Sequence, residues 1–83
     1  MKPNVTIVNP KDNVAIALED LAAGASVILP DGKEIKALSD IPFSHKVALT
    51  DIGAGEEIIK YGEVIGHALE AVRPGDWIHS HNL

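Results

Sequence analysis

The sequence predicts a small all-β domain, built mainly from short strands, with single-turn helices at some corners. The chain has 83 residues, which suits one domain spanning residues 1–83. Its apolar residues are mostly Ala, Val, Ile and Leu, which pack well on half-buried pleated surfaces. Seven Gly and five Pro in so short a chain indicate many turns, and therefore short strands in place of long helices.

A short pattern of Ala-Leu, an aliphatic residue, Gly and a second aliphatic residue recurs three times. It occupies residues 17–28, 48–59 and 68–79. We expect a strand to end at the Leu, the first aliphatic residue to tuck under a turn, and the Gly to adopt positive φ where the chain reverses. A helix in the Ala-rich first segment would end within about two turns, at Gly24. The unequal spacing indicates a repeated corner and not a solenoid, and Asp20 and Asp51 are expected to stabilise their turns.

The remaining sequence reads as strands separated by breaks. Strands are expected at residues 5–8, 14–18, 27–29, 34–37, 46–49, 58–61, 64–68 and 77–81. Pro30-Asp31-Gly32 lies between two of these runs, and Asp-Gly in that context is a strong hairpin signal.

Charge and composition restrict the partners. A net charge of −5 leaves no basic surface for nucleic acid or for an anionic membrane, although a local basic site for a small acidic substrate remains compatible with it. No apolar run approaches the length of a membrane span, and the first residues lack a signal-peptide core. The absence of Cys excludes disulfides and thiolate chemistry. We therefore expect a cytoplasmic protein.

Two histidines near the end of the chain are the first candidate site. His79 and His81 are two residues apart, so in a strand they share a face with Trp77. Such a pair can supply two metal ligands, or one ligand and a general base. The alternative is a solvated, frayed chain end. Two ligands are also too few for a complete metal shell, so another residue or chain would have to contribute.

Two further segments carry candidate residues. His45 and Lys46 follow the corner at Pro42, where they could bind a carboxylate or take part in proton transfer, or else cap a turn and remain solvated. In the second segment, Gly62 permits close backbone approach or an unusual φ. Its charged neighbours could equally protect an edge strand. This second segment is Lys60-Tyr61-Gly62-Glu63.

Four motifs in order carry a family resemblance. They are Asp12-Asn13-Val14-Ala15, Ile41-Pro42-x-x-His45-Lys46-Val47-Ala48-Leu49, Lys60-Tyr61-Gly62-Glu63-x-Ile65-Gly66-x-Ala68 and His79-x-His81-Asn82. Together they resemble the N-terminal SAF domain of the altronate and galactarate dehydratase family. They are equally similar to its free-standing small subunits, including the small subunit of sulfolactate sulfo-lyase. The match extends from about Val5 to Leu83.

The resemblance implies a β-clip fold and a role as the accessory domain or small subunit of a metal-dependent hydro-lyase that dehydrates sugar acids such as altronate or galactarate. Fe²⁺ or Mn²⁺ would serve the complete enzyme, and a larger catalytic domain or subunit would be the partner. The implied catalytic residues are His45, His79 and His81, the two last also as metal ligands. The implied substrate-binding residues are Lys46, Asn82, Lys60, Tyr61 and Glu63.

One departure and two alternatives accompany the resemblance. The family usually has Gly before the His-Lys pair, whereas this chain has Ser44, which would be strained by roughly 1 kcal/mol if the position requires positive φ. One alternative is the small subunit of a sulfolactate sulfo-lyase. The other is of a different class, a non-catalytic carbohydrate-binding or scaffold module. A regulatory or oligomerising domain that gates substrate entry to its partner is a further, separate possibility.

Overall fold

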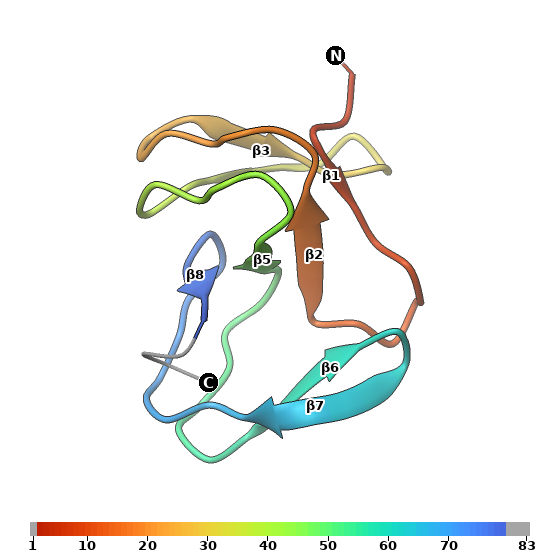
Figure 1. Ribbon diagram of the computed structural model, residues 1–83, viewed down its shortest axis with the longest axis vertical. Helices are drawn as coiled ribbons and strands as arrows, with labels where there is room; N and C mark the ends of the chain where they lie inside the picture. The colour runs from red at the N-terminus through yellow and green to blue at the C-terminus, as the bar shows by residue number, and fades with distance from the viewer. Residues whose placement is uncertain (1, 80–83) are drawn as a thin grey trace.

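The computed structural model describes residues 2–79, which form an all-β fold (Figure 1). The strands are β1 (Val5–Thr6), β2 (Val14–Ala17), β3 (Ser26–Ile28), β4 (Glu34–Lys36), β5 (Lys46–Ala48), β6 (Glu57–Lys60), β7 (Glu63–His67) and β8 (Trp77–Ile78). An antiparallel four-stranded sheet has the order β1-β2-β5-β8, and β3–β4 and β6–β7 form separate hairpins. The expected single-turn helices are absent from residues 2–79, where the corners are tight turns, and nothing in this range could cross a membrane as a helix.

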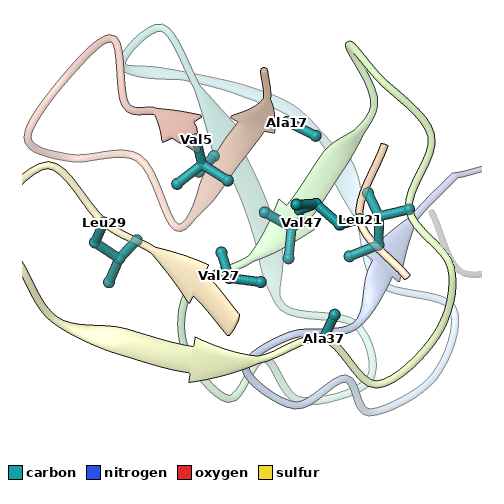
Figure 2. Close-up of a cluster of buried hydrophobic side chains, with 9 residues drawn as sticks. Val5, Ala17, Leu21, Val27, Leu29, Ala37 and Val47 are labelled. Atoms are coloured by element: carbon teal, nitrogen blue, oxygen red, sulfur yellow. The ribbon is translucent and has the colours of Figure 1, made fainter. Parts of the chain in front are cut away.

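Two apolar clusters form the core, and the four-stranded sheet contributes to both. Consecutive residues of β5 belong to different clusters, because Val47 packs in the first and Ala48 in the second. On β2, Ala15 and Val14 divide in the same way. This is the alternation that a strand imposes on its side chains. Figure 2 shows the first cluster, in which Val47 of β5 faces Val27 of the β3–β4 hairpin.

The repeated corner occurs four times, once more than the sequence pattern revealed. The fourth unit, residues 37–48, has the same order of bend, bridge, turn and strand as the other three. It was missed because Ser44 stands where the others have Gly. With this unit included, residues 17–47 and 48–78 are two tandem repeats of two units each, so the unequal spacing has an explanation. We name the units Ala17, Ala37, Ala48 and Ala68 after their first residues.

The units associate in pairs through their buried aliphatic residues. Leu21 of the Ala17 unit forms a two-way β-bridge with Ile41 of the Ala37 unit, with N···O distances of 2.8 and 2.7 Å. Ile52 and Val72 make the same bridge between the Ala48 and Ala68 units, at 3.0 and 2.8 Å. All four side chains are at most 3% exposed. The expectation that the aliphatic residue of each unit is buried beneath its turn is confirmed.

Each turn is closed by a residue of positive φ that donates its N–H to the first Ala of the paired unit. The φ values are 87° for Gly24, 71° for Ser44, 84° for Gly55 and 94° for Gly75. The acceptors are, in the same order, the carbonyls of Ala37, Ala17, Ala68 and Ala48, at 2.8 to 2.9 Å. The predicted backbone conformation of the three Gly is confirmed. Ser44 adopts the same conformation, which is the strained case that the sequence raised.

The two hairpins differ in their turns. β3–β4 reverses through Pro30-Asp31-Gly32 with Gly32 at φ 92°, as the Asp-Gly signal predicts. β6–β7 has a two-residue turn in which Tyr61 and Gly62 both have positive φ, 57° and 75°. Two consecutive positive φ values define a type I′ turn, whose twist matches that of the flanking strands.

Candidate functional site

Three aromatic side chains from two paired strands meet on one face of the sheet. In the β5–β8 ladder, Lys46 is the partner of Ile78 and Val47 that of Trp77. The same register continued by one residue places His45 opposite His79. Trp77 lies two residues before His79, so the two side chains leave the chain in the same direction. The pairing of β5 with β8 therefore brings His45, Trp77 and His79 together.

Ring geometry defines this cluster. The indole of Trp77 stacks on the imidazole of His79, with centroids 3.7 Å apart and planes at 28°. Its Nε1–H donates to Nδ1 of His45 at 3.1 Å, with the two rings tilted by 59°. An imidazole nitrogen that accepts a hydrogen bond carries no proton, so the proton of neutral His45 is on Nε2. The expectation that Trp77 and His79 share a face is confirmed, although the strand ends at Ile78.

The tandem repeat explains why a histidine can occupy this position. In the Ala68 unit the corresponding residue is Asp76, whose carboxylate accepts from the N–H of Arg73 at 2.7 Å. Glu56 has the same role in the Ala48 unit. In the Ala37 unit the donor position is occupied by Pro42, which has no N–H. The turn therefore requires no side-chain cap from His45, which leaves its ring available to Trp77. The alternative that His45 caps its turn is wrong.

Two lysines form a second group, from β5 and β6. Partial burial lowers the pKa of Lys46 below its ordinary value of 10.5, and the positive charge of Lys60 lowers it further. The ammonium of Lys60 lies 4.7 Å from the centroid of the Tyr61 ring, within the range of a cation–π interaction. A positive charge close enough to lower the pKa of Lys46 also favours an anion near the two lysines. This pair is therefore the basic group best suited to a carboxylate among the residues that the structure describes.

The structure separates His45 from Lys46, which the sequence had placed in one site. His45 lies with Trp77, which packs against the first apolar cluster. Lys46 is the partner of Ile78, a member of the second cluster, and is affected by Lys60 of β6. Consecutive residues that enter a strand point to opposite faces. The two residues thus belong to two groups, which we call the aromatic cluster (His45, Trp77, His79) and the lysine pair (Lys46, Lys60).

The turn that carries Lys60 and Tyr61 is fixed by Asp12. One carboxylate oxygen of Asp12 accepts from the N–H of Gly62 at 2.8 Å, and the other from the N–H of Asn9 at 3.1 Å. Burial by itself would raise the pKa of Asp12, but these backbone donors outweigh it and hold the pKa below 3.8. A Cβ at Gly62 would lie 2.7 Å from the side-chain nitrogen of Asn9, which would have to move, and the φ of 75° is one that Gly adopts without strain. The prediction for Gly62 is confirmed on both counts.

Asn13, the second residue of the first motif, also has a structural role. Its side-chain amide donates to the carbonyl of Glu57 at 2.9 Å and accepts from the N–H of Ile59 at 2.8 Å. The side chain thus pairs with β6 as a neighbouring strand would. Asn4 makes the same two bonds with the corresponding residues of β3, Ser26 and Ile28. The Asp12-Asn13 motif therefore has a structural role, because both side chains hold the β6–β7 hairpin in place.

The remaining predicted site residues are Glu63, His81 and Asn82. Glu63 is exposed and is the cross-strand partner of Lys60, so it sits at the base of the type I′ turn. His81 and Asn82 lie outside the described residues. Within residues 2–79, no three side chains of His, Asp or Glu come together as a metal shell would require, and Nδ1 of His45 is already bonded to Trp77. The described residues therefore do not fit an iron or manganese site by themselves.

Comparison with known proteins establishes the family. The family described as the altronate/galactarate dehydratase SAF domain matches residues 3–83, and the chain belongs to this family. It is 51% identical over 71 residues to galactarate dehydratase (L-threo-forming) of Escherichia coli K12, covering 86% of this chain and 13% of that protein. It is 46% identical to altronate dehydratase of the same organism, covering 86% of this chain and 14% of that protein. It is also 40% identical over 58 residues to (2R)-sulfolactate sulfo-lyase subunit alpha of Paracoccus pantotrophus, covering 68% of this chain and 87% of that subunit.

These comparisons confirm the resemblance drawn from the four motifs, and with it the β-clip SAF fold. The chain spans about a seventh of each dehydratase and most of the sulfo-lyase subunit. In its relatives this domain therefore occurs both as a small part of a larger lyase and as a subunit in its own right.

Proposed function

We propose that this chain is the accessory SAF domain or small subunit of a cytoplasmic hydro-lyase that dehydrates a sugar acid such as galactarate or altronate. The observation that supports the proposal best is the 51% identity to galactarate dehydratase over 71 residues of so short a chain. A larger catalytic domain or subunit completes the enzyme, because this chain corresponds to only 13% of that relative.

The lysine pair supports an acidic substrate. Dehydration beside a carboxylate requires that the carboxylate be held while a base removes the neighbouring proton and the hydroxyl leaves. Lys46 and Lys60 offer two positive charges on a net acidic protein, and both residues are partly buried. We assign them to binding a substrate carboxylate, with Tyr61 and Glu63 beside them on the turn. The base belongs to the larger partner in this proposal.

The aromatic cluster contributes polar contacts to the same substrate in the assembled enzyme. His79, which follows β8, and the residues His81 and Asn82 of the same motif are assigned to substrate contacts in this proposal. Fe²⁺ or Mn²⁺ is the proposed cofactor of the complete enzyme, where it would stabilise the negative charge that develops on the substrate. Residues 2–79 do not form its shell by themselves.

Affinity capture of the tagged chain from its native host extract tests the proposal. The expected result is one large co-purifying protein and, with added iron, a carbonyl product from galactarate or altronate. The variant Lys46→Gln should weaken substrate binding. Lys33→Gln, which changes an exposed lysine of the β3–β4 hairpin, should not. Recovery of the chain alone, without activity on any hydroxy acid, would favour a non-catalytic binding or scaffold module.

A second candidate, the small subunit of a sulfolactate sulfo-lyase, is favoured by one observation. The match covers 87% of the Paracoccus subunit, so nearly all of that subunit corresponds to this domain, whereas the match covers only a fraction of either dehydratase. Both reactions are eliminations beside a carboxylate and differ in the group that leaves. Release of sulfite from sulfolactate by the captured complex, with no product from galactarate or altronate, would select this candidate.

A further inference from the structure

We propose that Trp77 is a positioning residue that holds His45 as a neutral hydrogen-bond donor, through Nε2–H, to an oxygen of the bound hydroxy acid. The inference rests on the proposed function for the identity of the substrate, but its structural half concerns this chain alone. It assigns a role to Trp77 and replaces the catalytic role that the resemblance implied for His45 with a binding role.

The backbone of His45 is fixed on both sides. Its N–H donates to the carbonyl of Pro42 at 3.1 Å, and its carbonyl accepts from the N–H of Ala17 at 2.9 Å. The preceding residue, Ser44, is held in the turn by its own bond to Ala17. The main freedom left to His45 is the rotation of its side chain. That rotation determines which ring atoms face solvent and substrate.

Trp77 removes this remaining freedom. The indole is partly buried, packs against the first apolar cluster and is stacked on His79, so its N–H points in a defined direction. That N–H donates to Nδ1 of His45 at 3.1 Å. The ring of His45 is otherwise exposed. The result is an imidazole whose inner nitrogen is occupied and whose outer nitrogen carries the only proton.

The chemistry of this arrangement is restricted. A proton on Nδ1 would face the indole N–H, so the cationic form requires this hydrogen bond to break. Loss of the Nε2 proton from the neutral ring would leave an imidazolate, so proton donation to a leaving hydroxyl is excluded in this state. Neither nitrogen is free to bind a metal. What remains is hydrogen-bond donation from Nε2–H to a carboxylate or hydroxyl oxygen, with no proton transferred.

The tandem repeat gives independent support. Two other units place a carboxylate at the position of His45 to cap their own turns, in the form of Glu56 and Asp76. In the Ala37 unit, His45 stands where those units have the carboxylate, and Pro42 stands where they have the residue whose N–H is capped. The turn of the Ala37 unit keeps its backbone bonds without this cap. The side chain of His45 therefore takes no part in capping and is available for contacts outside its own turn.

Nitrogen NMR of the ¹⁵N-labelled 83-residue chain tests the structural half. In mildly alkaline solution, Nδ1 of His45 should appear as an unprotonated nitrogen and Nε2 as a protonated one, and the indole N–H should exchange slowly with water. Trp77→Phe keeps an aromatic ring against His79 but removes the donor, so both nitrogens should shift toward a tautomeric average. Phe43→Leu, an exposed aromatic beside the same turn, should leave them unchanged. Identical His45 nitrogen shifts in Trp77→Phe and the wild-type chain would overturn the inference.

Kinetics of the complete enzyme test the substrate half. His45→Ala should raise KM roughly ten- to hundredfold, the effect of losing a hydrogen bond to a charged group. His45→Gln, whose neutral amide can still donate, should recover most of that loss. Equal losses in the two variants would show proton transfer or metal binding by His45 and would overturn the inference. An enzyme without activity on hydroxy acids would refute the proposed function and the substrate half together, while the NMR result would still decide the role of Trp77.

Discussion

Asp20 and Asp40 cap each other's turns. Oδ1 of Asp20 accepts from the N–H of Phe43 in the Ala37 unit at 2.8 Å, and Oδ1 of Asp40 accepts from the N–H of Ala23 in the Ala17 unit at 2.9 Å. The two aspartates occupy the same position in paired units, so one interaction is made twice across the Leu21–Ile41 bridge. The predicted turn-stabilising role of Asp20 is confirmed, with a partner in another unit.

The first prediction concerns this capping. Asp20→Ala should lower the free energy of unfolding by about 1 kcal/mol, because the N–H of Phe43 loses its acceptor. Urea denaturation measures the effect. Asp51→Ala is the matched control, since it removes the corresponding aspartate of the Ala48 unit. The donor position opposite Asp51 is Pro74, which has no N–H, so its replacement should change stability by no more than about 0.5 kcal/mol. An equal loss in both variants would show that capping is not the cause.

The second prediction concerns Ser44. Since this residue has φ 71° where equivalent units have Gly, Ser44→Gly should stabilise the chain by about 1 kcal/mol, in thermal or urea unfolding. Gly24→Ser should cost a similar amount, because a Cβ there meets nothing within 4 Å and only the backbone is strained. Gly75→Ser should cost more, because its Cβ would also collide with the carbonyl of Lys36. A destabilised Ser44→Gly variant would contradict the argument.

Local features of this fold could be predicted from the sequence. The Asp31-Gly32 hairpin and the positive φ of Gly24 depend on a few neighbouring residues, and both were predicted. The fourth unit was missed because its key position has Ser44 in place of Gly, so a search for Gly could not find it. Aligning residues 17–47 with residues 48–78 would have revealed it.

Contacts between distant segments could not be predicted. His45 and Trp77 are 32 positions apart and meet only because β5 pairs with β8 in one particular register. The alternation of side chains at β5 places His45 and its neighbour Lys46 on opposite faces, although their proximity in sequence had suggested that they act together. The structural role of Asp12 depends on a similarly remote partner, the N–H of Gly62. Such pairings are specified by the whole set of strands and not by any one motif.

The third prediction concerns Asp12 and pH. Because backbone donors hold its pKa below 3.8, the ionised carboxylate stabilises the folded chain above that pH, and this contribution is lost as pH falls through the lowered value. Asp12→Asn should therefore be less stable than the wild-type chain at neutral pH, and the difference should shrink in acid. Urea midpoints measured from pH 7 to below 3.8 test this. Asp31→Asn serves as the control, since that carboxylate accepts only from Lys33, two residues away in the β3–β4 turn. A difference that does not vary with pH would refute the role of the charge.

The last prediction separates stability from function at Lys46. Its pKa is lowered in the folded chain, by burial and then by Lys60, so the unfolded chain binds this proton more tightly. The destabilising effect is therefore complete at neutral pH, where Lys46 is charged in both states, and it disappears as pH rises past 10.5, where both are neutral. Lys46→Met should be more stable than the wild-type chain at pH 7, and this advantage should be lost in alkali.

Two comparisons make this test specific. Lys60→Met should reduce the stability gained by Lys46→Met, because the repulsion between the two charges is then already gone. Lys33→Met, on the exposed β3–β4 hairpin, should show neither the gain nor the coupling. In the complete enzyme, the stabilised Lys46→Met variant should bind its hydroxy acid more weakly than the wild type. A chain that gained stability and kept its substrate affinity would show that the lysine pair destabilises the fold without serving the carboxylate.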